Sequence, residues 1–283
     1  MGLTETDLRL DEIDRIIDAA LKEDVGESDY STNLIIPCEK ISSAYLKAKD
    51  EGIVAGLEVA ERTFKKLDEN FEWIQNCNDG DTIKNGQIIA EMKGTFRAIL
   101  TGERTALNFL QRMSGIATQT AQFVEAVKPY KTKILDTRKT VPGLRLLDKY
   151  SVKAGGGTNH RIGLFDMIML KDNHIKIAGG ITKAVEQVRK SMPKKLKIEV
   201  ETSNLNEVEE ALNCNVDIIM LDNMDIATTI KAVKIAGGKI SLEASGNMTL
   251  ERVREVAAAG VDYISIGSLT HSVKALDIGQ YIK

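Results

Sequence analysis

The spacing of apolar residues changes along this chain, and the first hundred residues mix helical and strand patterns. Apolar residues between Leu10 and Leu21 recur at helical spacing behind Asp11, which predicts an amphipathic helix with Asp11 as its N-cap. Residues 41–100 combine short strand patterns with one helix pattern at 57–70, and their Asp-Gly and Asn-Gly pairs are typical of tight turns. These features predict a small α+β domain.

A long helical pattern follows and leads into a different rhythm. Apolar residues at helical spacing from 100 to 127 predict long helical structure with breaks at Gly102 and Gly115. Beyond it, short β-rich runs alternate with amphipathic helix patterns, which is typical of consecutive parallel βα units. Residues 150–155 are a weaker strand candidate. The six clear runs are 133–137, 165–170, 196–201, 216–221, 239–244 and 261–267.

Six or seven strands are too few for a closed eight-stranded barrel. We therefore predict an α/β protein with an N-terminal α+β domain and an open, incomplete α/β barrel of parallel strands. An open doubly wound sheet is the alternative, and it also gathers its loops at the carboxyl ends of the strands. We place the domains at 1–112 and 113–270, with a C-terminal segment, 271–283, that packs back on the first domain.

Polar or glycine residues follow nearly every predicted strand. The steps from Glu201 to Asp222, on to Ser245 and on to Gly267 are 21, 23 and 22 residues, about one βα unit each. In a parallel barrel such side chains converge on one mouth, where these barrels hold their sites. The residues concerned are Thr137, Arg138, Lys171, Asp172, Glu201, Asp222, Asn223, Ser245, Gly246, Gly267 and Ser268.

Positive charge is concentrated around the first of these strands. The 283 residues carry a net charge of −3, but residues 131–176 hold ten Lys and Arg against four Asp, a net +6. The remainder has 28 basic and 37 acidic residues, a net −9. Within the basic segment, Arg145, Lys149 and Lys153 lie four residues apart, which by itself fits a solvated helix face.

The other basic residues of this segment predict an anion-binding mouth. Two of them directly follow a strand, one closes an apolar strand, and two follow three glycines at 155–157. Glycine lets the backbone approach an anion closely, and an Arg side chain binds carboxylate or phosphate through two hydrogen bonds. The glycines alone equally fit a flexible turn. The basic residues are Arg138, Lys139, Lys171, His160 and Arg161.

Glu201 and Asp222 are carboxylates at the ends of otherwise apolar strands, and we expect them in the same mouth. They would repel a purely anionic ligand, but they suit one that has hydroxyl groups or brings a divalent cation. A phosphorylated sugar that carries Mg²⁺ meets both demands. The sequence has no P-loop, dinucleotide fingerprint or nucleophile elbow, so we expect catalysis by placed charges.

The composition excludes several classes of protein. With 43% hydrophobic and 28% charged residues and no long uncharged apolar run, the chain fits neither a disordered nor a membrane-spanning protein. An acidic balance with 5% aromatic residues disfavours nucleic acid as a partner. Three scattered cysteines indicate neither disulfides nor a zinc site, and no signal-peptide pattern is present, so we expect a cytoplasmic protein.

The chain resembles the quinolinate phosphoribosyltransferase family, also called nicotinate-nucleotide pyrophosphorylase (carboxylating), over nearly its whole length. The longest matching segment is DTRKTVPGLRLLDKYSVKAGGGTNHRIGLFDMIMLKDNHI (136–175). The others are TGERTALNFLQRMSGIAT (101–118), IEVET (198–202), IIMLDNM (218–224) and LEASGNM (242–248).

The resemblance implies a transferase that joins quinolinate to 5-phosphoribosyl-1-pyrophosphate with Mg²⁺ as the cofactor. The products would be nicotinate mononucleotide, pyrophosphate and CO2, in NAD biosynthesis. It also implies a homodimer or a larger assembly of dimers, and the two small anions as the ligands.

The family pattern also implies roles for individual residues. Arg138, His160, Arg161 and Lys171 match positions around the quinolinate carboxylates, and Arg104 matches an arginine supplied by the neighbouring subunit. Lys139, Glu201 and Asp222 match positions that hold phosphoribosyl pyrophosphate and its metal, which the pyrophosphate mainly carries. The catalytic candidates are Lys139, Lys171, Glu201 and Asp222, and further substrate-binding candidates are Thr137, Ser245, Gly246, Asn247, Ile266, Gly267, Ser268 and His271.

Three other functions compete with this interpretation. A paralogue of the same fold would use another acceptor, such as nicotinate. A Schiff-base lyase would use Lys171 at its strand end. A non-catalytic anion-binding protein is disfavoured by Glu201 and Asp222 in the same mouth.

Overall fold

A computed structural model describes residues 10–193 and 195–283, and the chain divides into two compact units. The first unit comprises residues up to 121 together with 140–156 and 269–283, and the second comprises 122–139 and 157–268. Both units are therefore built from separate stretches of the sequence. The domain limits predicted from the sequence, 1–112, 113–270 and 271–283, stay a prediction.

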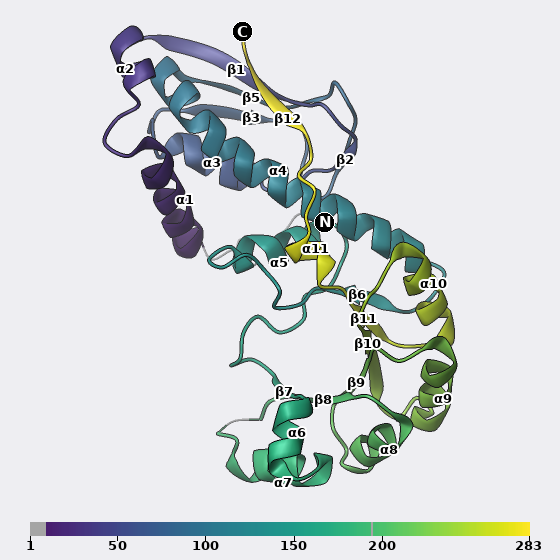
Figure 1. Ribbon diagram of the computed structural model, residues 1–283. Helices are drawn as coiled ribbons and strands as arrows, with labels where there is room; N and C mark the ends of the chain where they lie inside the picture. The colour runs from purple at the N-terminus through teal and green to yellow at the C-terminus, as the bar shows by residue number, and fades with distance from the viewer. Residues whose placement is uncertain (1–9, 194) are drawn as a thin grey trace. The chain divides into compact units, whose positions relative to one another are not determined.

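The first unit contains a four-stranded antiparallel sheet in the order β12-β1-β5-β3. Strand β12 (Ile278–Ile282), at the end of the chain, pairs with β1 (Ile41–Ala48) and forms one edge of this sheet (Figure 1). Buried apolar side chains around Phe64 form the core. The other elements are α1 (Leu10–Val25), α2 (Tyr30–Ile35), β2 (Gly52–Ile53), α3 (Leu57–Lys65), β3 (Glu72–Gln75), β4 (Thr82–Ile83), β5 (Ile88–Thr95) and α5 (Arg145–Ala154).

The long helix α4 (Phe96–Val127) corrects the predicted breaks at Gly102 and Gly115, because it runs through both without interruption. A side chain at Gly115 would place its Cβ 2.3 Å from the backbone oxygen of Lys274. At Gly102 it would lie 2.8 Å from the ring of Phe64. Glycine destabilises the interior of a helix. At these two positions it also allows Phe64 and Lys274 to pack closely against α4, which a side chain would prevent.

Two further predictions about local structure are wrong. Asp11 lies inside the first turn of α1, so it is not the N-cap, although its negative charge still favours that end of the helix. Residues 150–155, the weak strand candidate, belong to α5 up to Ala154, and Gly155 is the residue that ends this helix. Tyr150 and Val152 are two positions apart and supplied the alternation that suggested a strand, but Ser151 between them is buried as well, so no face of a strand is exposed there.

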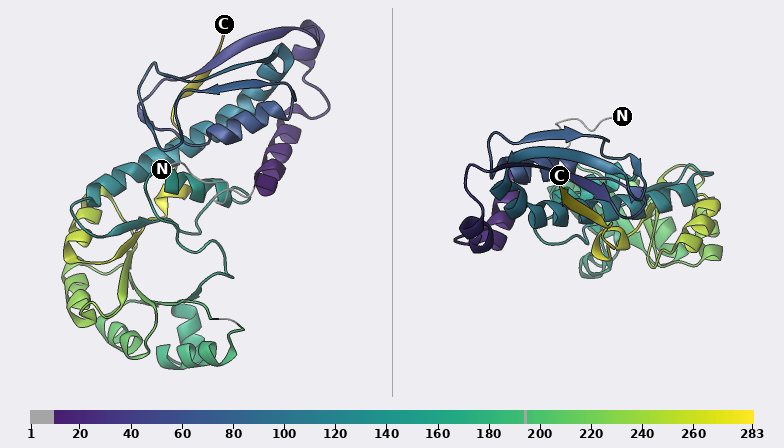
Figure 2. Two further views of the ribbon diagram at one scale, coloured as in Figure 1. Left: turned by 180° about the vertical axis from the view of Figure 1, so that it is seen from behind. Right: turned by 90° about the horizontal axis from the view of Figure 1, so that it is seen from above.

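The second unit is a six-stranded parallel sheet in the order β6-β11-β10-β9-β8-β7. It contains all six predicted strands, and β6 and β7 are its edges, so the barrel is open as expected (Figure 2). The strands are β6 (Lys133–Leu135), β7 (Ile168–Leu170), β8 (Ile198–Thr202), β9 (Ile218–Asp222), β10 (Ser241–Ser245) and β11 (Tyr263–Ser265).

Helices follow the strands and cover one face of this sheet (Figure 1). Three of them begin at a residue whose side chain accepts a hydrogen bond from a backbone N–H in the first turn, namely Asn204, Asp225 and Thr249. The helices are α6 (Asp172–Ala178), α7 (Ile181–Ser191), α8 (Leu205–Asn213), α9 (Ile226–Ala236), α10 (Leu250–Ala259) and the short α11 (Ser268–His271), which ends in the first unit.

Within the described ranges, no helix combines the length and the apolarity that crossing a bilayer requires. The cytoplasmic location expected from the sequence stays a prediction.

Candidate active site

Strand alternation places a row of polar side chains on the face of the parallel sheet opposite the helices. Glu199 and Glu201 are two residues apart on β8 and therefore share a face. The register pairs Glu201 with Met220 of β9, and Met220 with Glu243 of β10, so these side chains point the same way. Val200, Leu221 and Ala244, which follow Glu199, Met220 and Glu243, are apolar and buried on the other face.

The carboxyl ends of the strands carry the polar residues that the sequence predicts there. Asp222 and Ser245 end β9 and β10 as directly paired residues. Ile266 is buried, whereas Lys139 and Lys171 are exposed. The predicted residues of the second unit are Thr137, Arg138 and Lys139 after β6, Lys171 after β7, Glu201 on β8, Asp222 on β9, Ser245, Gly246 and Asn247 on and after β10, and Ile266, Gly267 and Ser268 after β11.

Lys171 and Glu201 form an ion pair across the ends of β7 and β8. The Lys171 Nζ lies 3.5 Å from Glu201 Oε2, with the lysine side chain half exposed. Burial raises the pKa of Glu201, Lys171 lowers it, and the nearby negative charge of Asp222 raises it again. Two carboxylates that repel each other suit a divalent cation, since Mg²⁺ prefers carboxylate oxygens. The donor set therefore fits the expected metal.

Two asparagines orient the carboxylate of Asp222. Asn223 Nδ2 donates to Asp222 Oδ2 at 3.0 Å, and Asn247 Nδ2 donates to Asn223 Oδ1 at 3.3 Å. Both asparagines have a positive φ, a backbone conformation that asparagine tolerates better than most residues. Gly246 lies beside them with a φ of +99°, and a Cβ there would be 2.0 Å from Asn223 Oδ1. The close approach of these two loops therefore requires glycine at position 246.

Gly246→Ala is expected to lower kcat/KM for the phosphoribosyl donor by about tenfold, because displacing Asn223 by about 1 Å releases the Asp222 carboxylate. Steady-state kinetics with the donor varied measure this. Gly260→Ala is the matched control: Gly260 has the same φ of +99°, but a Cβ there would meet only Val233 at 3.4 Å. Both variants pay a similar backbone strain of about 1 kcal/mol, and only the first should change the kinetics. Equal kinetic effects would contradict the orienting role of Asn223.

The end of β6 positions two arginines. Buried Asp136 accepts a hydrogen bond from the backbone N–H of His160 at 2.8 Å, which fastens the loop before Arg161 to the strand that precedes Arg138. Burial lowers the pKa of Arg161, and the nearby positive charge of Arg138 lowers it further. Arg161 also donates to the backbone oxygen of Met167 at 3.1 Å. Two arginines held this close suit a ligand with two negative groups.

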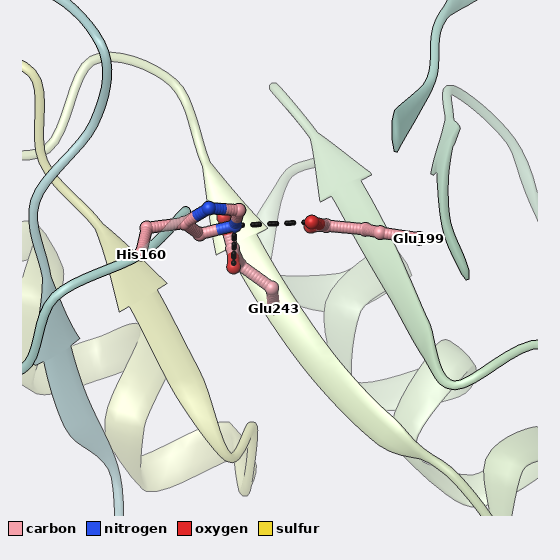
Figure 3. Close-up of side chains that lie close together, drawn as sticks. All are labelled: His160, Glu199 and Glu243. Carbon is pink, nitrogen blue, oxygen red and sulfur yellow. Dashed lines mark ion pairs between the residues drawn. The ribbon is translucent and has the colours of Figure 1, made fainter. Parts of the chain in front are cut away.

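His160 points into the barrel, toward two carboxylates (Figure 3). Its Nε2 lies 3.0 Å from Glu199 Oε2 and 3.2 Å from Glu243 Oε2. Both glutamates are completely buried, and the His160 side chain is 7% exposed. The other ring nitrogen, Nδ1, accepts a hydrogen bond from the backbone N–H of Arg161 at 2.7 Å. Both ring nitrogens therefore have partners within the protein.

The cluster of His160, Glu199 and Glu243 keeps a proton at neutral pH. Burial opposes a charge on His160, but its hydrogen bonds to the glutamates outweigh burial and raise its pKa to about 10. Burial also raises the pKa of Glu199, although His160 acts in the opposite direction. A raised pKa of His160 would put a proton on each ring nitrogen, whereas an Nδ1 that accepts the backbone N–H of Arg161 carries none. Because Nδ1 is an acceptor, we assign the proton to the region between Nε2 and the carboxylates.

Sequence analysis missed Glu199 and Glu243, because it treated β8 and β10 as apolar up to their last residues. The available signal was the alternation Glu-Val-Glu at 199–201 and the lone Glu243 within an apolar run. A charged residue within an apolar strand indicates a buried side chain that needs an oppositely charged or hydrogen-bonding partner. Among the described residues, the ligand atoms of His160, Glu199 and Glu243 lie within 4.8 Å of one another, as a metal site would require.

Two features of the basic segment serve the packing of the first unit. A Cβ at Gly155 would lie 2.3 Å from the backbone oxygen of Ala117, and Gly156 has a φ of +83° just after α5. Gly155 and Gly156 therefore end α5 and allow close packing. This fits the alternative given for the glycines at 155–157, a turn and not an anion-binding loop. Lys149 is buried, so Arg145, Lys149 and Lys153 do not form one solvated face.

Two predicted site residues belong to the first unit. Arg104 is exposed on α4, and His271 is exposed at the end of α11, where its Nδ1 lies 2.8 Å from Ser272 Oγ. Their roles toward substrate stay predictions.

An open parallel barrel that collects arginines, lysines and carboxylates at the carboxyl ends of its strands defines an α/β-barrel enzyme for small anionic substrates. Residues 29–114 match the N-terminal domain and residues 116–280 the C-terminal domain of quinolinate phosphoribosyl transferase. The chain belongs to the quinolinate phosphoribosyltransferase family.

Named relatives are similar over nearly the whole chain. A probable nicotinate-nucleotide pyrophosphorylase (carboxylating) of Synechocystis is 45% identical over 95% of this chain and 92% of its own length. One from Bacillus subtilis is 43% identical over 94% and 92%. The solved structure of the nicotinate-nucleotide pyrophosphorylase from Francisella tularensis is 40% identical, covers 98% of both chains and has a TM-score of 0.93.

Proposed function

We propose that this chain transfers the phosphoribosyl group of 5-phosphoribosyl-1-pyrophosphate to quinolinate with loss of CO2. The products are nicotinate mononucleotide, pyrophosphate and CO2, in the synthesis of NAD. The observation that carries the proposal is one mouth that holds both a pair of arginines and a pair of carboxylates. Full-length membership of the family supports it.

Quinolinate is a dianion with two neighbouring carboxylates, and Arg138 and Arg161 are the groups that suit it. Each guanidinium can donate two parallel hydrogen bonds to one carboxylate. Lys171 adds a third positive charge from the end of β7. Because the pyridine is held in one orientation, its ring nitrogen faces C1 of the ribose. The entropy lost in aligning the two substrates is then offset by their binding and does not add to the reaction barrier.

The carboxylates stabilise the reacting sugar. When pyrophosphate leaves C1, positive charge builds on the ribose ring, and Glu201 and Asp222 are the negative groups at this mouth that can stabilise it. Lys139 and the backbone N–H groups of 245–247, 267 and 268 are suited to the phosphates. The N–H of Ile266 is not, because it donates to the backbone oxygen of Leu135 at 2.9 Å. After the new C–N bond forms, the adjacent cationic nitrogen stabilises the electron pair that stays on the ring carbon as CO2 leaves, and a proton from water then takes the place of CO2 there, so no separate organic cofactor is needed.

Mg²⁺ is the expected cofactor, and Glu201 and Asp222 are the residues that would hold it together with the pyrophosphate oxygens. When bound, it would stabilise the negative charge of the departing pyrophosphate.

The proposed site is shared between subunits of a homodimer or larger assembly, with Arg104 reaching the neighbouring subunit's site. Mixing inactive Arg104→Ala with inactive Lys171→Ala subunits is then expected to restore up to about a quarter of the activity, since one site of each hybrid dimer carries both intact residues. Activity after subunit exchange, proven by mass spectrometry of tagged chains, measures this. Exchange without any recovery would contradict a shared site.

A side-by-side assay separates this function from its rivals. The chain is incubated with phosphoribosyl pyrophosphate, Mg²⁺ and either quinolinate or nicotinate, and nicotinate mononucleotide is quantified. We expect product from quinolinate, and none with EDTA in excess over the metal. Preference for nicotinate would favour the paralogue. Borohydride reduction in the presence of substrate tests the Schiff-base lyase, because it would trap an imine on Lys171.

A further inference from the structure

His160 is held by groups from three strands that are not neighbours in the sheet. Its backbone N–H donates to Asp136 just after β6, and its ring faces Glu243 of β10 and Glu199 of β8 (Figure 3). In the sheet, β11 separates β6 from β10, and β9 separates β10 from β8. The side chain therefore crosses the inside of the open barrel.

The open barrel explains why such a crossing matters. In a closed barrel, hydrogen bonds between neighbouring strands continue around the circle and fix the distance between opposite strand ends. Here β6 and β7 are both edges, so the sheet alone leaves the spacing between the end of β6 and the ends of β8 and β9 less constrained. Arg138 follows β6, whereas Glu201 and Asp222 end β8 and β9.

The proton of His160 favours a brace made by the protein, with His160 held between Glu199 and Glu243, over a bound metal at this place. Two fully buried carboxylates are costly unless groups of the protein compensate them. Nε2 of His160 faces both glutamates, while Nδ1 accepts a hydrogen bond from the backbone N–H of Arg161. The ring proton is therefore on Nε2, and a nitrogen that carries a proton does not bind a metal.

We infer that Glu199 and Glu243 are positioning residues: by holding His160 they set Arg138 and Arg161 at the correct distance from Glu201 and Asp222. The inference rests on the proposed function, because it assigns quinolinate to the arginines and the phosphoribosyl donor to the carboxylates. The brace therefore fixes the distance between the two substrates.

The inference predicts a selective loss. Without the brace, the arginine side of the mouth moves, whereas the donor side keeps the hydrogen bonds among Asp222, Asn223 and Asn247. Glu243→Gln and Glu199→Gln are expected to raise KM for quinolinate about tenfold and to lower kcat, with KM for the donor changed less than about twofold. A residue that only stabilised the fold would lower the fraction of active protein and leave both KM values unchanged.

The experiment compares these variants with matched controls in the full-length chain. Glu255→Gln on α10 and Glu209→Gln on α8 remove the same charge from exposed positions on the helices that follow β10 and β8. Activity of the unchanged chain tests the proposed function by itself, and if it forms no product from quinolinate, the proposed function fails. If the unchanged chain is active and the folded variants behave like the controls, the inference is overturned and the proposed function stands.

A measurement on the unchanged chain keeps the inference testable if the variants do not fold. With ¹⁵N-labelled histidine, NMR is expected to show His160 with a slowly exchanging proton on Nε2 and an unprotonated Nδ1. A rapidly exchanging proton on Nε2 would overturn the inference. Elemental analysis is a second test on the unchanged chain. One tightly bound transition metal per chain, absent from both variants, would show that His160, Glu199 and Glu243 form a metal site and would overturn the inference.

Discussion

Replacing Arg138 by alanine is expected to lower kcat/KM for quinolinate by about 100- to 1,000-fold, because a charged hydrogen-bonded pair in a desolvated site is worth about 3–4 kcal/mol. The loss should fall mainly on quinolinate binding, since Arg138 and Arg161 together suit the two carboxylates. The affinity for phosphoribosyl pyrophosphate should stay nearly constant. Steady-state kinetics and calorimetric titration with each substrate separate these effects.

Lys133→Ala is the matched control for Arg138→Ala. Lys133 is exposed at the opposite end of the same strand, β6, so its removal changes the net charge equally but leaves the mouth intact. Quinolinate affinity and turnover in Arg138→Ala that equal those of this control would exclude the assignment of quinolinate to the arginine pair.

Replacing Glu201 by glutamine is expected to lower kcat by about 100- to 1,000-fold while quinolinate still binds, because a group that stabilises charge only in the transition state acts on kcat. The substitution keeps the size of the side chain and removes its negative charge. It also removes the charge that pairs with Lys171 at 3.5 Å, so a small change in quinolinate affinity is expected as well.

Glu209→Gln on the helix after β8 controls for the loss of one negative charge. Single-turnover experiments with saturating substrates test whether bond cleavage at the ribose, and not product release, is slowed. A Glu201→Gln variant with unchanged single-turnover rate would remove this carboxylate from the chemistry and leave Asp222 as the remaining candidate.

The arrangement of the barrel could be predicted from the sequence because it depends on local patterns. Six apolar runs, the last four of them about one βα unit apart, indicate parallel strands, and the rule that sites lie at the carboxyl ends then located Lys171, Glu201 and Asp222 on one edge. The specific roles of these residues rested on the family resemblance, since the residue types alone also fitted a lyase or an anion-binding protein.

The features that escaped prediction depend on contacts between residues distant in the sequence. Gly115 looks like a helix break until Lys274, 159 positions later, is seen to pack against it. Glu199 and Glu243 look like isolated polar residues until His160 is placed between them. A single sequence gives the local preference of each residue, whereas these positions are determined by a partner that only the folded chain brings close.

The most direct test of the central claim uses quinolinate labelled with ¹³C in the carboxylate next to the ring nitrogen, together with phosphoribosyl pyrophosphate, Mg²⁺ and the unchanged chain. The proposed function predicts labelled CO2, nicotinate mononucleotide and pyrophosphate in equal amounts, with no CO2 when the phosphoribosyl donor is omitted. Release of CO2 without the donor, or formation of a nucleotide that keeps the label, would contradict it.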